Sequence, residues 1–171
     1  LLAGKSGISK ITSFDTSKYD HHYAGEVKNF NPCQFMDKRK ADRMGRSSQM
    51  AVAATKLALL DAKLGKKTIA NKRTGVVAGT TMGEPQILEG LYYKSALSKK
   101  LVIDSISALT YSPNFITLSV AKEFGLNSYN LLFGNACSAG NYALGYAFDL
   151  IKTNKADMII AGGVDAFSAI A

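Results

Sequence analysis

The sequence YNLLFGNACSAGNYALGYAFDLIKT, residues 129–153, joins an apolar strand to a helix through a short turn that contains a cysteine. Its first part, Tyr129–Phe133, is predicted as a strand, and Ala139–Thr153 as a helix. The helix is apolar or small nearly all round, which is typical of a buried helix. Gly140 and Gly145 each cost about 1 kcal/mol relative to alanine, so close packing must compensate. We therefore expect this helix to lie between layers of sheet.

The rest of the chain alternates between helix and strand. Strands are predicted at Thr74–Gly79 and at Met158–Ala161, which ends at two glycines. The first thirty-five residues are predicted as an extended loop. The predicted helices run from Ser47, as the N-cap, to Leu64 before Gly65, from Glu84 to Lys94, and from Pro113 to Phe124 before Gly125. This alternation predicts an α/β fold with a largely parallel, buried sheet.

Composition places the chain among ordinary globular proteins. Hydrophobic residues make up 47% of its 171 residues and charged residues 20%, enough apolar material for a core. No run of eighteen apolar residues occurs, so no membrane span is expected. The start lacks the features of a signal peptide and is interpreted as a chain entered partway through. Two dissimilar cysteines, Cys33 and Cys137, favour a reducing, cytoplasmic setting.

The formal net charge of +8 is unevenly distributed. Residues 1–100 carry a balance of +10, whereas residues 101–171 carry −2. A basic first half suggests an anionic partner such as an acidic protein, a phosphorylated ligand or a nucleic acid. Nucleic acid is not expected, because zinc-finger, basic-zipper and aromatic RNA-binding patterns are missing from the sequence. An ordinary solvated surface explains the same charge.

Cys137 is the candidate nucleophile. A thiolate at a helix N-terminus is stabilised by unpaired backbone N–H groups and by the positive end of the helix dipole. The same N–H groups can donate to a developing oxyanion, and Gly134 and Gly140 leave room for a carbonyl. This arrangement suits acyl transfer through a thioester. A small buried hydrophobic cysteine is the alternative interpretation.

The run Asn135–Gly140 resembles the nucleophile motif of the condensing enzymes, the β-ketoacyl synthases of fatty acid and polyketide assembly. Further similar motifs occur in the family's order over essentially the whole chain. They include Lys5–Ile8, Phe14-Asp15, Ala24–Val27, Phe35–Arg39, Ser48–Ala54, Gly79-Thr80, Gly83-Glu84, Phe124–Leu126 and Ala161–Ala166. Asn135 departs from the usual Thr or Ser, which leaves the subfamily open.

The resemblance implies a thiolase-like fold, an αβαβα layered sandwich that forms a homodimer or a heterodimer with a related synthase subunit. Residues 1–171 are expected to be the N-terminal β-ketoacyl synthase domain, incomplete at both ends. The C-terminal half, which in the family brings two histidines and a lysine, is expected to be absent. The chain's own His21 and His22 are interpreted as solvated loop residues.

The implied activity is a decarboxylative Claisen condensation of an acyl chain on Cys137 with a malonyl-type carrier-protein thioester. The implied substrates arrive on the phosphopantetheine of an acyl carrier protein, and neither a separate cofactor nor a metal is expected. By position in the family, Met82 is expected at the floor of the acyl pocket, although an ordinary core methionine is the alternative. The expected carrier-protein docking residues are Lys38, Arg39, Lys40 and Arg43, with Lys99 and Lys100 as a weaker cluster.

Three alternatives of other classes remain open. A non-catalytic ketosynthase-like partner subunit typically lacks the nucleophile that this chain has in Cys137. A cysteine hydrolase of the α/β-hydrolase type requires Gly-x-Cys-x-Gly, but Asn135 and Ala139 occupy the glycine positions. A basic nucleic-acid-binding domain would show salt-dependent binding of DNA or RNA.

Overall fold

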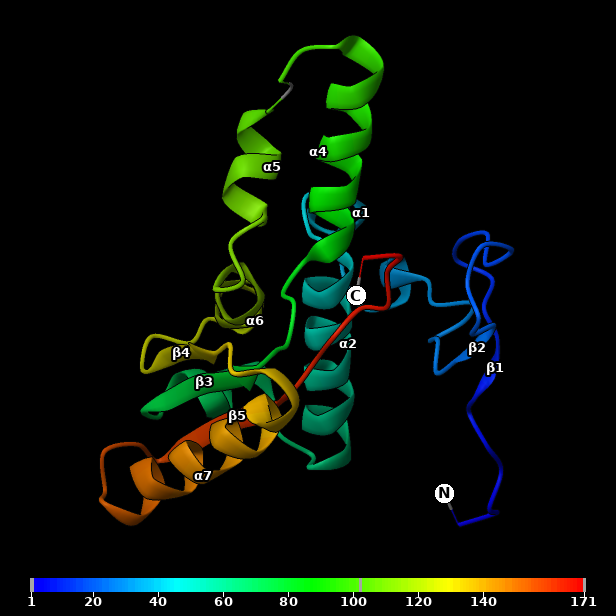
Figure 1. Cartoon of the computed structure of the whole chain (residues 1–171). Helices are drawn as coiled ribbons and strands as arrows, with labels where there is room; N and C mark the ends of the chain where they lie inside the picture. The colour runs from blue at the N-terminus through cyan, green and yellow to red at the C-terminus, as the bar shows by residue number, and fades with distance from the viewer. Residues whose placement is uncertain (1, 102, 171) are drawn as a thin grey trace.

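A three-stranded parallel sheet forms the centre of the computed structural model, which describes residues 2–101 and 103–170 (Figure 1). Its order is β4 (Asn130–Phe133), β3 (Thr74–Gly79) and β5 (Met158–Gly163). Both neighbours of β3 run parallel to it, and Gly79 is paired with Phe133 and with Gly163. The predicted α/β class with a parallel sheet is confirmed.

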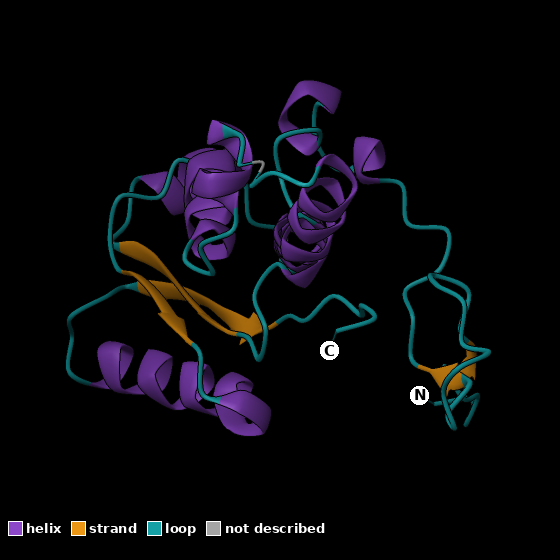
Figure 2. Cartoon of the chain, turned by 45° about the horizontal axis from the view of Figure 1, so that its top comes forward, coloured by secondary structure: helices purple, strands orange, loops and turns teal. Residues whose placement is uncertain are grey.

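One face of the sheet is covered by α6 (Phe115–Phe124) and α2 (Arg46–Asp61), as Figure 2 shows. Val76 of β3 points into this side, where it belongs to a core with Val52 of α2 and Val120 of α6. The small helices α1 (Lys38–Ala41) and α3 (Lys66–Ala70) contribute Ala41 and Ile69 to the same core. Residues of β3, α2, α6, α1 and α3 thus form this core.

The opposite face of the sheet is covered by α7 (Ala139–Lys152) alone among the described residues (Figure 2). Val77, the next residue of β3, points to this side and packs with Ala143 and Leu150. Successive residues of a strand point to opposite faces, so one short apolar run supplies both cores. This is why β3 reads as a continuous apolar segment.

The first part of the chain was predicted as loop, and this is wrong for two short strands. β1 (Ser9–Lys10) pairs antiparallel with β2 (Tyr23–Ala24), and the 3-10 turn η1 (Pro32–Gln34) follows. Glu26 holds this segment together, because its carboxylate accepts hydrogen bonds from the backbone N–H groups of Thr12 and Ser13. Bonds from Ser13 and Thr12 lower the pKa of Glu26 to about 2.

The helix α2 starts differently from the prediction. Ser47 lies inside its first turn, the N-cap is Gly45, and the cap is supplied by Glu84 from another segment. The Glu84 carboxylate accepts the N–H groups of Ser47 at 3.0 Å and Ser48 at 2.7 Å. Burial raises the pKa of Glu84, although these hydrogen bonds oppose the shift. The helix also ends before Gly65, at Asp61, and Gly65 instead begins α3.

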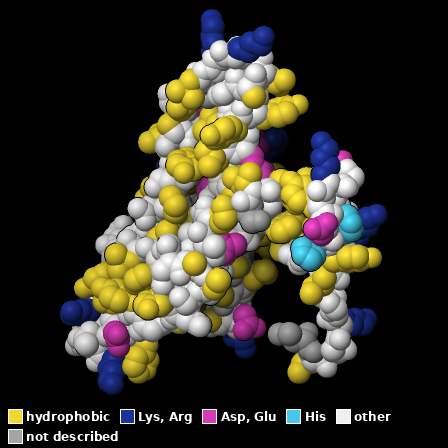
Figure 3. Space-filling view, in the orientation of Figure 1, with side chains coloured by type: hydrophobic (Ala, Val, Ile, Leu, Met, Phe, Trp, Pro, Cys, Tyr) yellow, Lys and Arg dark blue, Asp and Glu magenta, His cyan; other side chains and the backbone are white. Residues whose placement is uncertain are grey.

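Two further helices form an arm that projects from the body (Figure 1). α4 (Pro85–Ser98) extends past its predicted end at Lys94, and α5 (Ser105–Thr110) was not predicted. Figure 3 shows hydrophobic side chains along this arm and basic side chains at its far end. The exposed apolar residues of the arm and of the turns at its ends are Tyr92, Tyr93, Leu97, Leu101, Ile103, Ile106, Leu109 and Tyr111. No described helix has the length and apolar character needed to cross a bilayer.

Candidate functional site

Cys137 lies where the sequence placed it, between β4 and α7. The chain leaves β4 at Phe133, turns through Ala136, and enters a 3-10 turn, η2 (Ala136–Ser138), that leads directly into α7. Ala136 has φ +55°, a left-handed conformation that costs a residue with a side chain roughly 1–2 kcal/mol. This sharp turn leaves Cys137 exposed, so the alternative of a buried hydrophobic cysteine is wrong for this chain.

The start of α7 lies close against the carboxyl ends of β3 and β5, in a contact that requires glycine at position 79 and is tight at Gly163. A Cβ at Gly79 would overlap the carbonyl of Ala139 and the backbone nitrogen of Gly140. A Cβ at Gly163 would lie 3.3 Å from Gly140 Cα. These close backbone contacts therefore fix the distance between the sheet and the start of α7, and with it the position of Cys137. Ligands of open parallel α/β sheets bind at this edge.

The arrangement around Cys137 suits nucleophilic attack on a carbonyl. The thiol precedes a helix of fourteen residues, whose N-terminal N–H groups and dipole favour negative charge. Gly134 has open space around it, which leaves room for a substrate next to the turn. Ser138 Oγ lies 3.4 Å from both the side-chain nitrogen and the carbonyl oxygen of Asn135, and these contacts link the two sides of the turn. The local geometry therefore supports covalent acyl transfer.

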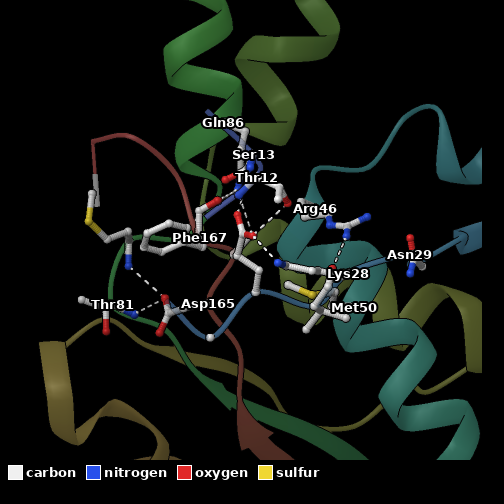
Figure 4. A pocket seen from close by; sticks show the side chains of 15 residues that line it. Thr12, Ser13, Lys28, Asn29, Arg46, Met50, Thr81, Gln86, Asp165 and Phe167 are labelled. Carbon is white, nitrogen blue, oxygen red and sulfur yellow. Dashed lines mark hydrogen bonds and ion pairs between the residues drawn. The ribbon is translucent and has the colours of Figure 1, made fainter. Parts of the chain in front are cut away.

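Met82 follows β3 in a turn at the same end of the sheet. Its side chain is 41% exposed and lines a cavity of about 890 Å³, so it is not a core methionine in this chain. Figure 4 shows this cavity with Thr81, Asp165 and Gln86 around it. Of the described residues, Cys137 is not among those that line it. The structure thus brings Met82 and Cys137 to one edge of the sheet without placing them in one cavity.

Asp165 is a residue of this edge that sequence reasoning did not single out. Its Oδ1 accepts three hydrogen bonds, from Thr80 Oγ1 at 2.8 Å, Thr81 N at 2.8 Å and Met82 N at 3.2 Å. An acidic residue two positions after a strand that ends in two glycines was the available signal. Its partners are more than eighty residues away in the sequence, so pattern alone does not find them.

The four predicted docking residues lie together on and after α1, and all are exposed. Lys38 pairs with Asp42 at 2.9 Å, and Lys40 pairs with Glu123 at 2.6 Å. Within the described part of the chain, Arg39 and Arg43 have no ion pair, so they are the cations most available to a partner. Lys99 and Lys100 are exposed at the end of the arm.

Two other sequence predictions concern residues outside this edge. His21 and His22 are exposed in the N-terminal segment, as predicted, and His22 Nδ1 lies 3.1 Å from Thr16 Oγ1. Cys33 is exposed and free in the η1 turn, distant in sequence from the Cys137 junction. Within the described part of the chain, His22 contacts Thr16 and His21 lies among other N-terminal residues, so neither is assigned to the chemistry of Cys137.

A parallel sheet whose carboxyl edge presents a cysteine at the start of a helix agrees with the thiolase-like class of acyl-transfer folds that the sequence motifs implied. The comparison with protein families then gives the particular family. The chain belongs to the β-ketoacyl synthases, since the family described as "Beta-ketoacyl synthase, N-terminal domain" matches residues 1–169. The resemblance inferred from the sequence motifs is confirmed.

Curated relatives agree with this family. The chain is 34% identical over 166 residues to a 3-oxoacyl-[acyl-carrier-protein] synthase 2 of Staphylococcus aureus, covering 96% of this chain and 41% of the relative. It is 34% identical over 174 residues to the synthase of the same name from Synechocystis sp., covering 97% and 40%. The chain therefore spans about two fifths of the length of these relatives.

Solved structures confirm the predicted thiolase-like fold class. The ishigamide ketosynthase/chain length factor matches with a TM-score of 0.92 at 30% identity, over 98% of this chain and 42% of that one. A β-ketoacyl synthase from Burkholderia phymatum matches with a TM-score of 0.81 at 25% identity, over 98% and 42%. A type II polyketide acyl-carrier protein in complex with its ketosynthase, AntDE:AntF, matches with 0.74 at 26%, over 95% and 39%. These matches disfavour the hydrolase and nucleic-acid-binding alternatives.

Proposed function

We propose that the protein containing this chain is a β-ketoacyl-(acyl carrier protein) synthase, an acyltransferase in which Cys137 carries the acyl chain. The observation that carries the proposal is the exposed Cys137 at the start of α7, positioned by the glycine contacts of Gly79 and Gly163. Family membership supports it independently. A non-catalytic partner subunit is disfavoured, because the nucleophile is present and is presented to solvent.

The reaction divides into two transfers. The Cys137 thiolate attacks the carbonyl of an acyl thioester, the tetrahedral intermediate collapses, and the carrier thiol leaves. The acyl group is then on Cys137. Loss of carbon dioxide from a malonyl-type thioester supplies a carbanion that attacks this acyl group, forms the new carbon–carbon bond and releases the Cys137 thiolate. Residues 1–171 supply the nucleophile and the helix N-terminus, and we propose that the proton-handling groups lie in a further half of the fold.

The outer face of α7 supports this assignment of the chain as the first half of a thiolase-like sandwich. Three large apolar residues are exposed there, namely Leu144, Phe148 and Ile151, whereas Tyr142 and Tyr146, although partly exposed, pack against Phe133 of β4. The sequence predicted a helix buried all round, but within this chain only the opposite stripe is buried. We propose that the second half packs on this face and completes the αβαβα layering.

The proposed partners are an acyl carrier protein and a second synthase subunit, identical or related. The basic residues on and after α1 suit an acidic carrier protein, whose phosphopantetheine presents the substrate. The AntDE:AntF complex, a carrier protein with its ketosynthase, and the ishigamide ketosynthase/chain length factor support the two kinds of partner. In this proposal Met82 limits acyl length, no resident cofactor or metal takes part, and the location is cytoplasmic.

Intact-mass analysis of the complete gene product tests the nucleophile. After incubation with an acyl-carrier thioester, the wild-type protein should gain the mass of one acyl group, and Cys137→Ala should gain none. Cys33→Ala is the matched control, since Cys33 is the other free and exposed thiol, and it should be acylated like the wild type. Undiminished acylation of Cys137→Ala overturns the proposal.

A further inference from the structure

The turn that carries Met82 is held by side chains rather than by a strand ladder. After Thr80, whose N–H bonds to Phe133 at 2.9 Å, the chain leaves the sheet. The N–H groups of Thr81 and Met82 then donate to Asp165 Oδ1, and the N–H of Gly83 donates to Thr80 Oγ1 at 3.0 Å. Thr80 Oγ1 itself donates to Asp165 at 2.8 Å. Asp165 is therefore the point on which this short network converges.

The far end of the turn is fixed independently. Ser47 Oγ donates to the carbonyl of Gly83 at 2.6 Å, and the next residue, Glu84, is buried and bonded to the start of α2. Gly83 adopts φ +71°, and a Cβ there would lie 2.9 Å from Pro113 Cγ. The backbone before and after Met82 is thus held in place, and Met82 lines the cavity. Figure 4 shows Asp165 next to Thr81 of the same turn.

We propose that Asp165 is a positioning residue that determines acyl-chain selectivity by holding Met82 at a fixed place on the sheet edge that also carries Cys137. This inference rests on the proposed function, in which Met82 limits the acyl chain. Methionine is unbranched and has three rotatable bonds, so its side chain alone is a poor stop. A stop of defined position requires a fixed backbone, and Asp165 supplies it through three bonds to a single oxygen atom.

Removing that oxygen atom releases three donors at once, so the turn relaxes and Met82 is no longer held at its place on the edge that carries Cys137. Longer acyl chains should then be accepted, while Cys137 and the glycine contacts that place it are untouched. One methylene in an apolar pocket changes selectivity by about 10- to 200-fold, so a shift on the order of tenfold per step of chain length is expected.

The test measures kcat/KM of the complete gene product for a series of acyl-carrier substrates of increasing length. Asp165→Ala should move the preference toward longer chains on the order of tenfold, mainly through KM, with Cys137 acylated as before by a short substrate. Asp165→Asn keeps an oxygen acceptor at the Oδ1 position and should retain the wild-type preference. Asp15→Ala is the control for loss of an aspartate turn, because Asp15 accepts from Ser17 N and Ser17 Oγ away from this edge.

A double-mutant cycle separates selectivity from general damage. In a Met82→Ala background, Asp165→Ala should produce no further change in length preference, because the side chain through which it acts is gone. If Asp165→Ala does not fold, Thr80→Val tests the inference instead. It removes the hydroxyl that bonds to Asp165 and Gly83, and the same shift in length preference is expected. An unchanged preference with normal Cys137 acylation overturns the inference alone, whereas failure of wild-type acylation overturns the proposed function.

Discussion

The two faces of the central sheet differ in the size and exposure of the side chains on the helices that cover them. On the side of α6 and α2, the large side chains Val52, Val120 and Phe124 pack toward the sheet and are almost completely buried. On the side of α7, the residues that meet the sheet are mainly small, with Ala139 and Ala143 among them. Leu150 of α7 also faces the sheet and is buried, whereas Leu144 is 54% and Phe148 is 63% exposed. A helix that exposes large apolar residues on the side away from its sheet is expected to be covered by a further layer.

The difference identifies two kinds of surface on one chain. The apolar outer face of α7 is suited to a permanent neighbour, because large exposed apolar patches mark such interfaces. The side of α6 and α2 carries the exposed basic residues of α1, which suit a partner that binds and leaves. Three changes, taken from the largest expected effect to the smallest, test this division.

The largest effect is expected from a charge on the outer face of α7. Leu144 and Leu57 of α2 are both 54% exposed in this chain, so they form a matched pair. If α7 is covered in the complete gene product, Leu144→Asp buries an unpaired carboxylate and should cost about 3 kcal/mol or more of unfolding free energy. Leu57→Asp should stay within about 0.5 kcal/mol, as is usual for surface changes.

Denaturant unfolding of the complete gene product measures the stability of both variants. A change in the midpoint at constant slope reports a change in stability, whereas a change in the slope reports a change in compactness. Equal losses for Leu144→Asp and Leu57→Asp would show that the outer face of α7 meets solvent, and the proposed second layer would then be wrong.

The sequence predicted the sheet and the Cys137 junction because both depend on neighbouring residues. β3, β4 and β5 are apolar runs bounded by glycine or turn residues, and the helix period follows Cys137 directly. The pattern in α7 also showed that it is apolar on every side, but it does not show which layer of the fold supplies each neighbour. Which layer covers each side of α7 therefore depends on contacts with residues outside the helix.

The features that were missed depend on residues far apart in the chain. The cap of α2 was assigned to Ser47, whereas the structure uses Glu84, thirty-seven residues away from Ser47. The hydrogen bond from Thr81 N to Asp165 joins residues that are eighty-four positions apart. The strands β1 and β2 are only two residues long, too short to show a period. Local pattern therefore predicted the elements and the nucleophile, and tertiary contacts decided caps, turns and short strands.

An intermediate effect is expected from a methyl group at the sheet edge. Gly79→Ala places a Cβ against the backbone of Ala139 and Gly140, so the start of α7 must shift. Overpacking of this kind costs about 1–3 kcal/mol, and it should also slow acylation of Cys137 because the turn moves. Gly90→Ala in α4 is the control, since Gly90 is an exposed helical glycine and no atom lies near its added Cβ.

Thermal unfolding and the rate of Cys137 acylation report on these two glycine variants. Gly90→Ala should change stability by no more than about 1 kcal/mol, the usual helix-propensity difference, and should acylate at the wild-type rate. A wild-type acylation rate in Gly79→Ala would show that the glycine contact does not position the nucleophile.

The smallest effect is expected on the basic side of the molecule. Arg39 and Arg43 carry no ion pair among the described residues, whereas Lys38 and Lys40 are partly neutralised by Asp42 and Glu123. Charge attraction acts mainly on the association rate and weakens as salt rises. Reversing both arginines to glutamate should therefore lower the apparent affinity for carrier-bound substrate on the order of tenfold at low salt.

The salt dependence and the substrate decide what the two arginines do. Reaction with a small soluble thioester needs no protein docking, so the double variant should use it as the wild type does. Lys152→Glu with Lys155→Glu reverses the same charge at the far end of α7 and should leave the carrier affinity nearly unchanged. Equal losses with both substrates would make Arg39 and Arg43 structural residues. If neither substrate is affected, carrier docking lies elsewhere, and Lys99 and Lys100 at the end of the arm become the next residues to reverse.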